Sequence, residues 1–356
     1  MKEPRKVRVL IAPDWRSGSP YQRLLTEALA AQKIEIDFLS EYRRLLPLAR
    51  AVPSHSCDLL HLHWPEAYYL VKGSKSDIFR RARFKMDLRL ATRSLPMVLT
   101  AHNLVPHNRG SEAFVRANAV AAFKTATRII AHSTMAKDAV VKAMKIDSHR
   151  CHVVRHGDLS IGLGGPLPRQ EARGRLSLGS DQICLMFGTV EPYKGVEEII
   201  SFWKREVPSV TLAIVGKPMT NTYGEAIGAM ASDTFQVITR FGWLSDEALK
   251  LWLSAVDVVL FNYTSILTSG AACLARSWGV PILIREDLTT VDLDEPSPLV
   301  FRFDTDLAAQ LKNALSTVPD YSAASDWRAA CDWRLVAQST IDVYREAVAD
   351  ARANKR

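Results

Sequence analysis

The sequence predicts an α/β protein of two domains, each built on a parallel β-sheet. At 356 residues the chain exceeds the length at which a single hydrophobic core usually stops growing. Short apolar runs alternate with helical segments in both halves, which is typical of parallel sheets covered by helices on both faces. Residues 157–168 hold four glycines and two prolines, a composition that favours irregular surface backbone. We therefore expect domains at residues 1–165 and 166–329.

The composition indicates a globular protein of an ordinary kind, with 47% hydrophobic and 24% charged residues. We find no apolar run that approaches the roughly 20 residues needed to span a bilayer. Charges lie too close to the short apolar run at the N-terminus for a signal peptide. The five cysteines are scattered and lack paired metal spacing, so we expect reduced thiols in a cytoplasmic protein.

The first half should contribute five strands, with a helix at Tyr21–Ala30 between the first two. The expected strands are Val7–Ala12, Ile34–Leu39, Asp58–Trp64, Met97–His102 and Arg128–His132. Ligands of parallel sheets bind outside the carboxyl ends of the strands. The polar and aromatic residues expected at those ends are Asp14, Arg16, Ser17, Gly18, His63, Trp64, His102, Asn103 and Ser133.

The excess positive charge lies in the first half. Residues 1–165 carry 27 Lys and Arg against 14 Asp and Glu, whereas the remainder carries 19 against 24. Much of the excess alternates with apolar residues in one basic segment, at Lys72, Lys75, Arg80, Arg81, Arg83, Lys85, Arg89 and Arg93. This pattern suits an anionic membrane surface, and equally a solvated helix face with a buried stripe. We expect no nucleic-acid partner, because no helix-turn-helix, RNA-binding aromatic motif or zinc finger accompanies the charge.

The second half repeats the alternation. Strands are expected at Ile183–Phe187, Thr211–Val215, Asp257–Phe261 and Pro281–Ile284, and helices at Val196–Lys204 and Asp246–Ser254. The loops at the strand ends are Gly188–Gly195, Gly216–Pro218 and Phe241–Trp243. No Gly-x-Gly-x-x-Gly fingerprint and no P-loop sequence occurs, which removes the main support for nicotinamide and ATP-hydrolase functions.

The turn at Thr268-Ser269-Gly270 is a candidate anion site. It follows an apolar strand and supplies a capping hydroxyl and an unobstructed backbone where the helix AACLARSW begins. The free N–H groups and the positive dipole end of a helix favour a phosphate. The alternative is a generic strand-to-helix turn, such as any α/β protein needs.

Several motifs in order resemble a known family. The segments FG…PYKG, AIVGKP, FGWLSDEALKLWLSAVDVVLF and SGAACLARSWGVPIL resemble the donor-binding domain of a family 4 (group 1) glycosyltransferase of the GT-B fold. DLLHLHWPEA and LTAHNLVPH resemble its acceptor-side domain. The resemblance implies two Rossmann-like domains that face each other across a cleft. Asp332–Tyr344 resembles the terminal helices that return to the first domain, so we expect residues 330–356 to pack there.

By this resemblance the second domain binds a nucleotide diphosphate sugar. Such a leaving group needs fixed cations and N–H donors, and not necessarily a metal. Gly188 is then expected to open the phosphate loop and Lys194 to contact phosphate, the alternative being an exposed loop lysine. Phe241 and Tyr263 are candidates for a nucleoside pocket, or else for the core. The full set of donor-site candidates is Gly188, Thr189, Lys194, Gly216, Lys217, Phe241, Tyr263, Thr268, Ser269 and Gly270.

Two departures from the family pattern stand out. The arginine common after the first glycine is replaced by Thr189 or Val190, and the Glu-x₇-Glu positions are occupied by Ile266 and Leu274. Neither apolar residue can hydrogen-bond a sugar or ribose hydroxyl. The chain therefore resembles the bacterial exopolysaccharide and β-mannosyltransferase-like branch that lacks this motif, and retaining or inverting chemistry stays open.

Catalysis is then expected to depend on the first domain. His102 is the first candidate, as a base or as a hydrogen-bonding partner of the donor sugar, and Asp14 is the second. His61 shares a strand face with His63, for which a structural role is an equal alternative. Ser17–Ser19 forms either an anion loop or a tight turn. The acceptor-site candidates are Arg16, Ser17, Gly18, Tyr21, His63 and Asn103, and no metal set is expected, since His102 and His107 lack companion carboxylates.

These features predict a metal-independent hexosyl- or glucuronosyltransferase with no cofactor beyond its UDP- or GDP-linked donor. The expected acceptor is a glycan or a glycan linked to polyprenyl diphosphate, in bacterial exopolysaccharide or surface polysaccharide synthesis. The expected location is cytoplasmic, peripheral on the inner face of the plasma membrane. UDP-glucose, UDP-glucuronate and GDP-mannose are all compatible donors. A sugar-nucleotide epimerase of the same architecture and a non-catalytic nucleotide- or glycan-binding protein are the alternatives.

Overall fold

The computed structural model describes residues 7–40, 45–70, 77–104, 112–206, 209–233, 236–288, 293 and 297–353. The chain divides into two units. Unit 1 comprises Met1–Gly157 and Cys331–Arg356, and unit 2 comprises Asp158–Ala330. Each unit is built around a six-stranded sheet in which the paired strands are parallel, so the predicted α/β class is confirmed.

The sheet of unit 1 has the strand order β2-β1-β3-β4-β5-β6. Its strands are β1 (Arg8–Ala12), β2 (Glu35–Phe38), β3 (Leu59–Leu62), β4 (Met97–Thr100), β5 (Arg128–Ala131) and β6 (Cys151–Val153). The central strands β3 and β4 are buried at every position, as expected where helices cover both faces of a parallel sheet. The first five strands lie where the sequence predicted them, and β6 is an additional edge strand.

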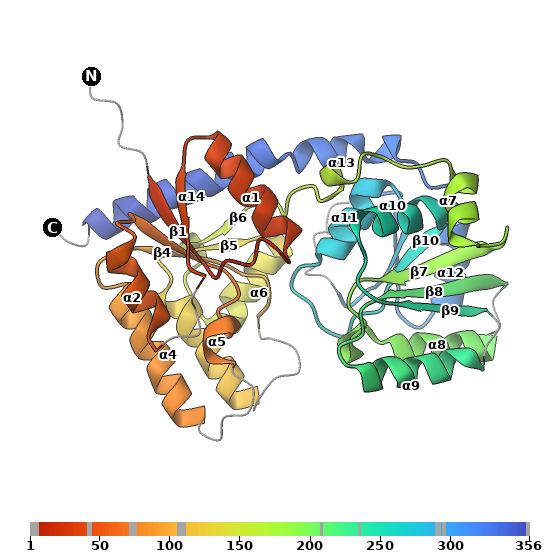
Figure 1. Ribbon diagram of the computed structural model, residues 1–356, viewed down its shortest axis with the longest axis horizontal. Coiled ribbons are helices and arrows are strands. Elements are labelled where there is room, and N and C mark those ends of the chain that lie inside the picture. The colour runs from red at the N-terminus through yellow and green to blue at the C-terminus, as the bar shows by residue number, and fades with distance from the viewer. Residues whose placement is uncertain are drawn as a thin grey trace. The chain divides into compact units, whose positions relative to one another are not determined.

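The helices of unit 1 come from both ends of the chain. They are α1 (Pro20–Ala31), α2 (Pro47–Ser54), α3 (Glu66–Tyr69), α4 (Asp77–Ala91), α5 (Glu112–Thr125), α6 (Thr134–Met144) and α14 (Trp333–Ala353). Figure 1 shows the blue C-terminal helix α14 beside the red helix α1, and α14 also packs on β3, β4 and β5. The Tyr344 side chain of α14 is fully buried against this sheet. The last segment of the chain thus completes unit 1.

The sheet of unit 2 has the order β12-β11-β10-β7-β8-β9. Its strands are β7 (Gln182–Phe187), β8 (Val210–Gly216), β9 (Val237–Phe241), β10 (Val258–Phe261), β11 (Ile282–Arg285) and β12 (Val300–Phe303). Its helices are α7 (Arg169–Leu176), α8 (Val196–Glu206), α9 (Asn221–Ser232), α10 (Asp246–Ala255), α11 (Gly270–Trp278), α12 (Leu307–Leu315) and α13 (Ser325–Ala330).

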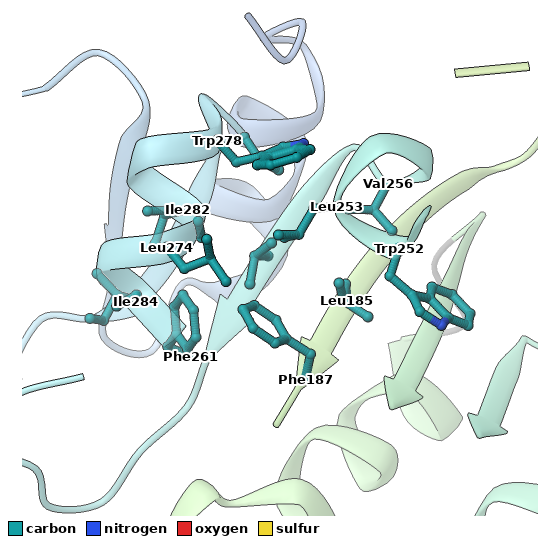
Figure 2. Packing of buried hydrophobic residues seen from close by; sticks show 14 of the residues in the cluster. Leu185, Phe187, Trp252, Leu253, Val256, Phe261, Leu274, Trp278, Ile282 and Ile284 are labelled. Atoms are coloured by element: carbon teal, nitrogen blue, oxygen red, sulfur yellow. The ribbon is translucent and has the colours of Figure 1, made fainter. Parts of the chain in front are cut away.

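Two apolar cores cover the two faces of this second sheet. One core joins the sheet to α10 and α11 through side chains such as Trp252, Leu274 and Trp278, as Figure 2 shows. The other core joins it to α8, α9 and α12, with Trp203 as its largest fully buried side chain. Helices therefore pack on both faces of the sheet, and these contacts fix the positions of the strand ends from which the loops begin.

Each strand order has one point at which the chain changes direction across the sheet. In unit 1 this point lies between β1 and β3, and in unit 2 it lies between β7 and β10. Loops that leave two such neighbouring strands diverge, and the crevice between them is where open α/β sheets bind ligands. The loops in question are residues 13–19 and 63–65 in unit 1, and residues 188–195 and 262–269 in unit 2.

The segment between the halves is more buried than the sequence suggested. The units divide at Gly157 and Asp158, eight residues before the expected end of the first domain. Gly157 has φ +87°, and a Cβ there would lie 2.5 Å from the Trp333 ring. The buried Asp158 carboxylate accepts hydrogen bonds from the backbone N–H and the hydroxyl of Ser160, at 2.8 and 2.7 Å. Surface exposure of this segment is thus confined to its later residues.

Candidate functional site

In unit 2 the first loop of the crevice depends on two glycines. Gly188 follows β7 with φ +97°, and Gly216 ends β8 with φ +139°. A Cβ on Gly216 would lie 1.8 Å from the carbonyl oxygen of Gly188, which no side chain tolerates. Because both residues are glycines, no side chain covers the backbone at the start of residues 188–195. A ligand can therefore approach this backbone closely.

Lys194 places a buried cation beside this backbone. It lies on a short turn, Pro192–Lys194, and is 7% exposed. Its Nζ donates a 3.4 Å hydrogen bond to the Phe187 carbonyl and lies 5.4 Å from the centroid of the Tyr263 ring. No ion pair joins it to a carboxylate in the described part of the chain. Burial lowers the pKa of Lys194 to about 8. Its ammonium group therefore stays charged at neutral pH, without an ion-pair partner among the described residues.

The alternative of an exposed loop lysine is thereby ruled out. A desolvated ammonium group is costly to maintain, and an anion that reached it would recover part of that cost. The position of Nζ also fits a ligand above Gly188, because a Cβ on Gly188 would lie only 3.2 Å from it.

The second loop of this crevice is tied to the first by hydrogen bonds. Asn262, directly after β10 and 1% exposed, donates from Nδ2 to the Gly195 carbonyl at 3.1 Å and to Glu198 at 2.9 Å. Thr264 N–H donates to the Tyr193 carbonyl at 2.7 Å. Asn262 was not among the residues predicted from the sequence, although an amide side chain directly after a buried strand was the available signal. These bonds fix the loop of Lys194 against β10.

The helix start predicted at residues 268–270 is present. Ser269 is the N-cap of α11, and its hydroxyl accepts a 3.2 Å hydrogen bond from Ala272 N–H. The Tyr263 hydroxyl is hydrogen-bonded to the same side chain. The hydroxyl therefore serves the helix itself. The backbone N–H groups of Gly270 and Ala271 have no hydrogen-bond partner among the described residues, so the first turn of α11 still offers donors.

Ile266 and Leu274, at the two positions where the family pattern has glutamates, both pack against the apolar core. Leu274 is buried on the core side of α11, near Phe261 and Ile284 in Figure 2. Ile266 packs partly against the same core. A carboxylate at position 274 would be desolvated. The packing of α11 therefore requires an apolar residue where the family pattern has a glutamate.

The remaining donor-site candidates of unit 2 lie farther out. Thr189 is exposed and hydrogen-bonded to the Tyr193 side chain. Lys217 is exposed, and its carbonyl accepts from Val190 N–H at 2.9 Å. Phe241 ends β9, is 37% exposed, and lines a cavity of about 350 Å³ with the more exposed Trp243. The structure thus brings Gly188, Lys194, Gly216, Tyr263, Ser269 and Gly270 together. Thr189 is exposed on the loop of Lys194, whereas Lys217 follows β8 and Phe241 ends β9.

In unit 1 the first loop of the crevice contains an ion pair. Arg16 donates from Nε and Nη2 to the two oxygens of Asp14, at 2.8 and 2.9 Å, and its guanidinium lies 3.5 Å from the centroid of the Phe38 ring. The hydrogen bonds from Arg16 hold the pKa of Asp14 below its usual value. The two residues were predicted to act separately as base and acceptor ligand. Their pairing makes Asp14 a weak base.

Ser17–Ser19 forms a tight turn, the second of the two alternatives. The N–H groups of Gly18 and Ser19 both donate to the Trp15 carbonyl, at 3.0 and 2.9 Å. Ser19 caps α1 by accepting from Gln22 N–H at 3.3 Å. Arg16, Ser17 and Gly18 are exposed on this turn and remain accessible to a ligand.

Five buried histidines lie at the carboxyl ends of β3 to β6. This histidine cluster consists of His61, His63, His102, His132 and His156. The Tyr21 ring is surrounded by the last four, with centroid distances of 4.8 to 6.1 Å. Tyr21 is 6% exposed and His63 is fully buried, so neither of these two acceptor-site candidates has an open surface. Asn103, next to the cluster, is half-buried.

Hydrogen bonds distinguish the members of the cluster. His61 is bonded through both ring nitrogens, to the Tyr344 hydroxyl at 2.6 Å and the Thr100 hydroxyl at 2.8 Å. This arrangement gives His61 the structural role, because it ties α14 to the sheet. His63 Nδ1 lies 3.1 Å from His102 Nε2.

Burial favours the neutral form of four members of the cluster. It lowers the pKa values of His61 and His156 to about 3, and those of His63 and His102 well below the usual value, with neighbouring histidines contributing in the same direction. In the described part of the chain, no three His, Cys, Asp or Glu side chains are grouped as they would be around a metal ion, and His107 lies outside that part.

The basic segment is described only in part. Lys72, Lys75 and the side chains of Arg80 and Arg81 lie outside the described residues. Arg83 Nη2 donates to the Tyr68 carbonyl at 2.7 Å, and Phe84 and Leu88 are buried, whereas Met86 and Leu90 are 48% and 41% exposed. Helix α4 thus presents both charge and apolar surface. The described helices include none with the length and apolarity required to cross a bilayer.

Comparisons with known proteins identify the architecture. No protein-family model matches the chain. Over 266 residues, it is 26% identical to a GDP-mannose:glycolipid 4-beta-D-mannosyltransferase of Xanthomonas campestris pv. campestris, covering 72% of this chain and 70% of that protein. The fold resembles sucrose-phosphate synthase of Thermosynechococcus elongatus, with a TM-score of 0.74, 17% identity and coverage of 97% and 100% of the two chains. It also resembles Anabaena HepE, solved with UDP and glucose, with a TM-score of 0.69, 16% identity and coverage of 96% and 100%.

These similarities confirm the resemblance seen in the motifs. The structural matches extend over almost the whole chain, so they account for both sheets and for the returning helix α14. The sequence relative is a glycosyltransferase. The chain is therefore a glycosyltransferase of the GT-B fold, similar to family 4.

Proposed function

We propose that this glycosyltransferase moves a hexosyl or glucuronosyl residue from a UDP- or GDP-linked donor to a lipid-linked glycan, in bacterial exopolysaccharide or surface polysaccharide synthesis. The observation that carries the proposal is the position of Lys194. Its buried ammonium group lies beside the bare Gly188 backbone, in the same crevice as the start of α11. This is an anion site, and a nucleotide diphosphate is the anion that the reaction releases.

The donor diphosphate is expected to bind between Lys194 and the first turn of α11. As the glycosidic bond breaks, negative charge grows on the leaving phosphate. The ammonium group and the N–H groups of Gly270 and Ala271 are preorganised donors for that charge. Since the chain supplies its own cation here, we propose that transfer requires neither a metal ion nor another cofactor. Phe241, at the cavity beside β9, is the proposed nucleoside contact.

The sugar and acceptor contacts are assigned to unit 1. We propose His102 as the side chain that contacts the reacting sugars, because it is the most exposed member of the histidine cluster and stacks on Trp64 of the second loop. Asp14 is the second catalytic candidate, although its ion pair with Arg16 argues for a positioning role. Arg16, Ser17 and Gly18 on the exposed turn, with Asn103, are the proposed acceptor contacts.

The named substrates of the mannosyltransferase relative support GDP-mannose as the first donor to test and a glycolipid as the acceptor. Solved complexes of HepE contain UDP and glucose, so UDP-glucose is the second. We therefore propose assays with GDP-mannose, UDP-glucose and UDP-glucuronate against polyprenyl-diphosphate-linked oligosaccharides, with the product anomer determined by NMR. Transfer that depends on the acceptor supports the proposal. Conversion of free sugar nucleotide without acceptor indicates an epimerase, and no turnover with intact nucleotide binding indicates a non-catalytic binding protein.

We also propose that α4 brings unit 1 to the cytoplasmic face of the plasma membrane. Its exposed Met86 and Leu90 lie among exposed Arg89 and Arg93, a combination suited to an anionic lipid surface. Sedimentation with anionic vesicles should decrease when Arg80, Arg81, Arg83 and Lys85 are neutralised. Unchanged sedimentation would remove this part of the proposal and leave the donor site unaffected.

A further inference from the structure

One ring nitrogen of His102 has a defined partner, and the other does not. His102 Nε2 lies 3.1 Å from Nδ1 of His63, which is fully buried at the end of β3. His102 is 8% exposed, and its Nδ1 has no hydrogen-bond partner among the described residues. Nδ1 is therefore the atom that His102 can present to a ligand, and its chemistry depends on which nitrogen carries the proton.

Only two arrangements of protons fit this contact between two neutral imidazoles. In the first, His63 Nδ1–H donates to His102 Nε2, and His102 then carries its proton on Nδ1. In the second, His102 Nε2–H donates to His63 Nδ1, and the proton of His63 is then on Nε2. The first makes His102 Nδ1 a hydrogen-bond donor, and the second makes it an acceptor.

The surroundings of His63 favour the first arrangement. His63 Nε2 is buried without a hydrogen-bond partner. The neighbouring His61, with its ring centroid 4.1 Å away, uses both nitrogens for Tyr344 and Thr100. The second arrangement would thus leave an orphaned N–H group in the core. Buried donors without partners are rarer than buried acceptors without partners.

The plane of the His102 ring is fixed as well. The Trp64 ring stacks on it with a centroid distance of 4.4 Å and an angle of 12°, and the Tyr21 ring meets it edge-on at 5.2 Å. Trp64 has φ +43°, a left-handed backbone that a bulky residue rarely adopts. Such strain persists where the surrounding structure requires it, and it is common at functional sites. Trp64 and Tyr21 thus hold the ring, and His63 selects the ring nitrogen that carries the proton.

We propose that His63 is a positioning residue that holds His102 in the Nδ1–H tautomer, so that His102 donates a hydrogen bond to the reacting sugars instead of acting as their base. This inference rests on the proposed transferase function and specifies how the His102 site acts. The base for the acceptor hydroxyl is then to be sought elsewhere.

The tautomer can be measured directly by long-range ¹H–¹⁵N NMR of the full chain labelled with [¹⁵N]histidine. The chain has nine histidines, and the spectrum of a His102→Gln variant identifies the His102 signals. We expect a protonated Nδ1 and a bare Nε2 on His102 at pH 7.5. A protonated Nε2 overturns the proposal, whatever the activity of the enzyme, because this measurement uses the unmodified protein.

The His63→Phe variant keeps a flat ring and removes the donor. We expect His102 to lose its preference for Nδ1–H and the kcat of transfer to fall by about 10- to 100-fold, with the KM values of donor and acceptor nearly unchanged. The control is His156→Phe in the same cluster, where the ring makes a long 3.4 Å contact to the Gly157 carbonyl. An unchanged tautomer in His63→Phe overturns the proposal even if kcat falls. Absence of transfer by the unmodified enzyme with every donor would count against the proposed function alone.

Discussion

The two units share one architecture and differ in their buried ionisable groups. Both have six parallel strands with a crevice where the chain changes direction. Unit 1 contains all nine histidines of the chain, five of them buried and clustered, whereas the sequence of unit 2 contains none. Unit 2 instead buries the ammonium group of Lys194. The shared topology determines where a ligand can bind, and the buried side chains determine what charge it should have.

This difference supports the proposed assignment of the donor to unit 2 and of the acceptor to unit 1. A crevice with a fixed cation and free helix N–H groups suits the diphosphate of the donor. A neutral imidazole such as that of His102 in unit 1 suits uncharged sugar hydroxyls, which need directional hydrogen bonds and no net charge. The buried groups also give each unit its own response to pH, which provides direct tests of the comparison.

Acid should destabilise unit 1 selectively, and this is the largest effect that we expect. A histidine whose folded pKa is lowered contributes stability above its unfolded pKa of about 6.5, and this contribution is lost as pH falls toward the folded value. His61 and His156, with pKa values of about 3, should together cost about 4 kcal/mol of unit 1 stability between pH 7 and pH 5. Hydrogen exchange resolved by peptide, corrected for intrinsic rates, measures this loss.

Unit 2 is the internal control for that experiment. It has no histidine, and its Lys194 stays protonated throughout this range. Its strands should keep their protection from exchange at pH 5. Equal loss of protection in the strands of both units would show that the histidine cluster is not the acid-labile element.

Removal of the fixed cation should have the next largest effect. Lys194→Ala eliminates a charged hydrogen-bond donor to the diphosphate, which is worth about 1.5 to 3 kcal/mol. We therefore expect GDP and UDP to bind roughly 10- to 100-fold more weakly by calorimetry. Lys312→Ala, an exposed lysine of α12 in the same unit, is the matched control and should bind normally. Normal binding by Lys194→Ala would contradict the donor-site assignment.

Nucleotide binding should also weaken in mild alkali. Burial lowers the pKa of Lys194 to about 8 in the free protein, and a bound diphosphate favours the charged form. Affinity should therefore be constant below pH 7 and fall by up to about tenfold per pH unit above pH 8. Titrations at pH 7, 8 and 9 test this, and the decline should be absent in Lys194→Ala. A decline of the same size in that variant would assign it to another group.

Much of this organisation was accessible from the sequence, and the exceptions have physical causes. Strand periodicity and motif order identified the strands and the loops at their carboxyl ends, because a parallel sheet puts all carboxyl ends at one edge. Local patterns contain no information on which side chains meet across strands. Asp14 and Arg16 were therefore predicted as independent residues, and Tyr21 and His63 as acceptor contacts, whereas the first two form an ion pair and the last two are buried.

The buried state of Lys194 was unpredictable for the same reason. It results from the contact of Gly188 with Gly216 and from the bonds of Asn262, residues that are far apart in sequence. The cluster of five histidines likewise forms only when four parallel strands come together. Motif resemblance identified the loops, and the three-dimensional packing determined the chemistry of each side chain.

The smallest effect concerns Ser269, which the sequence placed in the donor site. Its hydroxyl caps α11 through Ala272 N–H, so Ser269→Ala should cost about 1 kcal/mol of stability, as loss of an N-cap usually does. Nucleotide affinity should change by less than about threefold, because Lys194 and the backbone N–H groups remain.

The matched control for this change is Ser245→Ala, which removes the N-cap of α10, where the hydroxyl accepts from Ala248 N–H at 3.2 Å. Urea unfolding followed by tryptophan fluorescence should show a loss for Ser269→Ala at least as large as for Ser245→Ala, because Ser269 is also the partner of the buried Tyr263 hydroxyl. If Ser269→Ala instead weakens GDP binding as much as Lys194→Ala does while Ser245→Ala leaves it intact, the hydroxyl is a direct phosphate ligand. The anion site of unit 2 would then depend on a side chain where the present geometry assigns backbone donors and one buried cation.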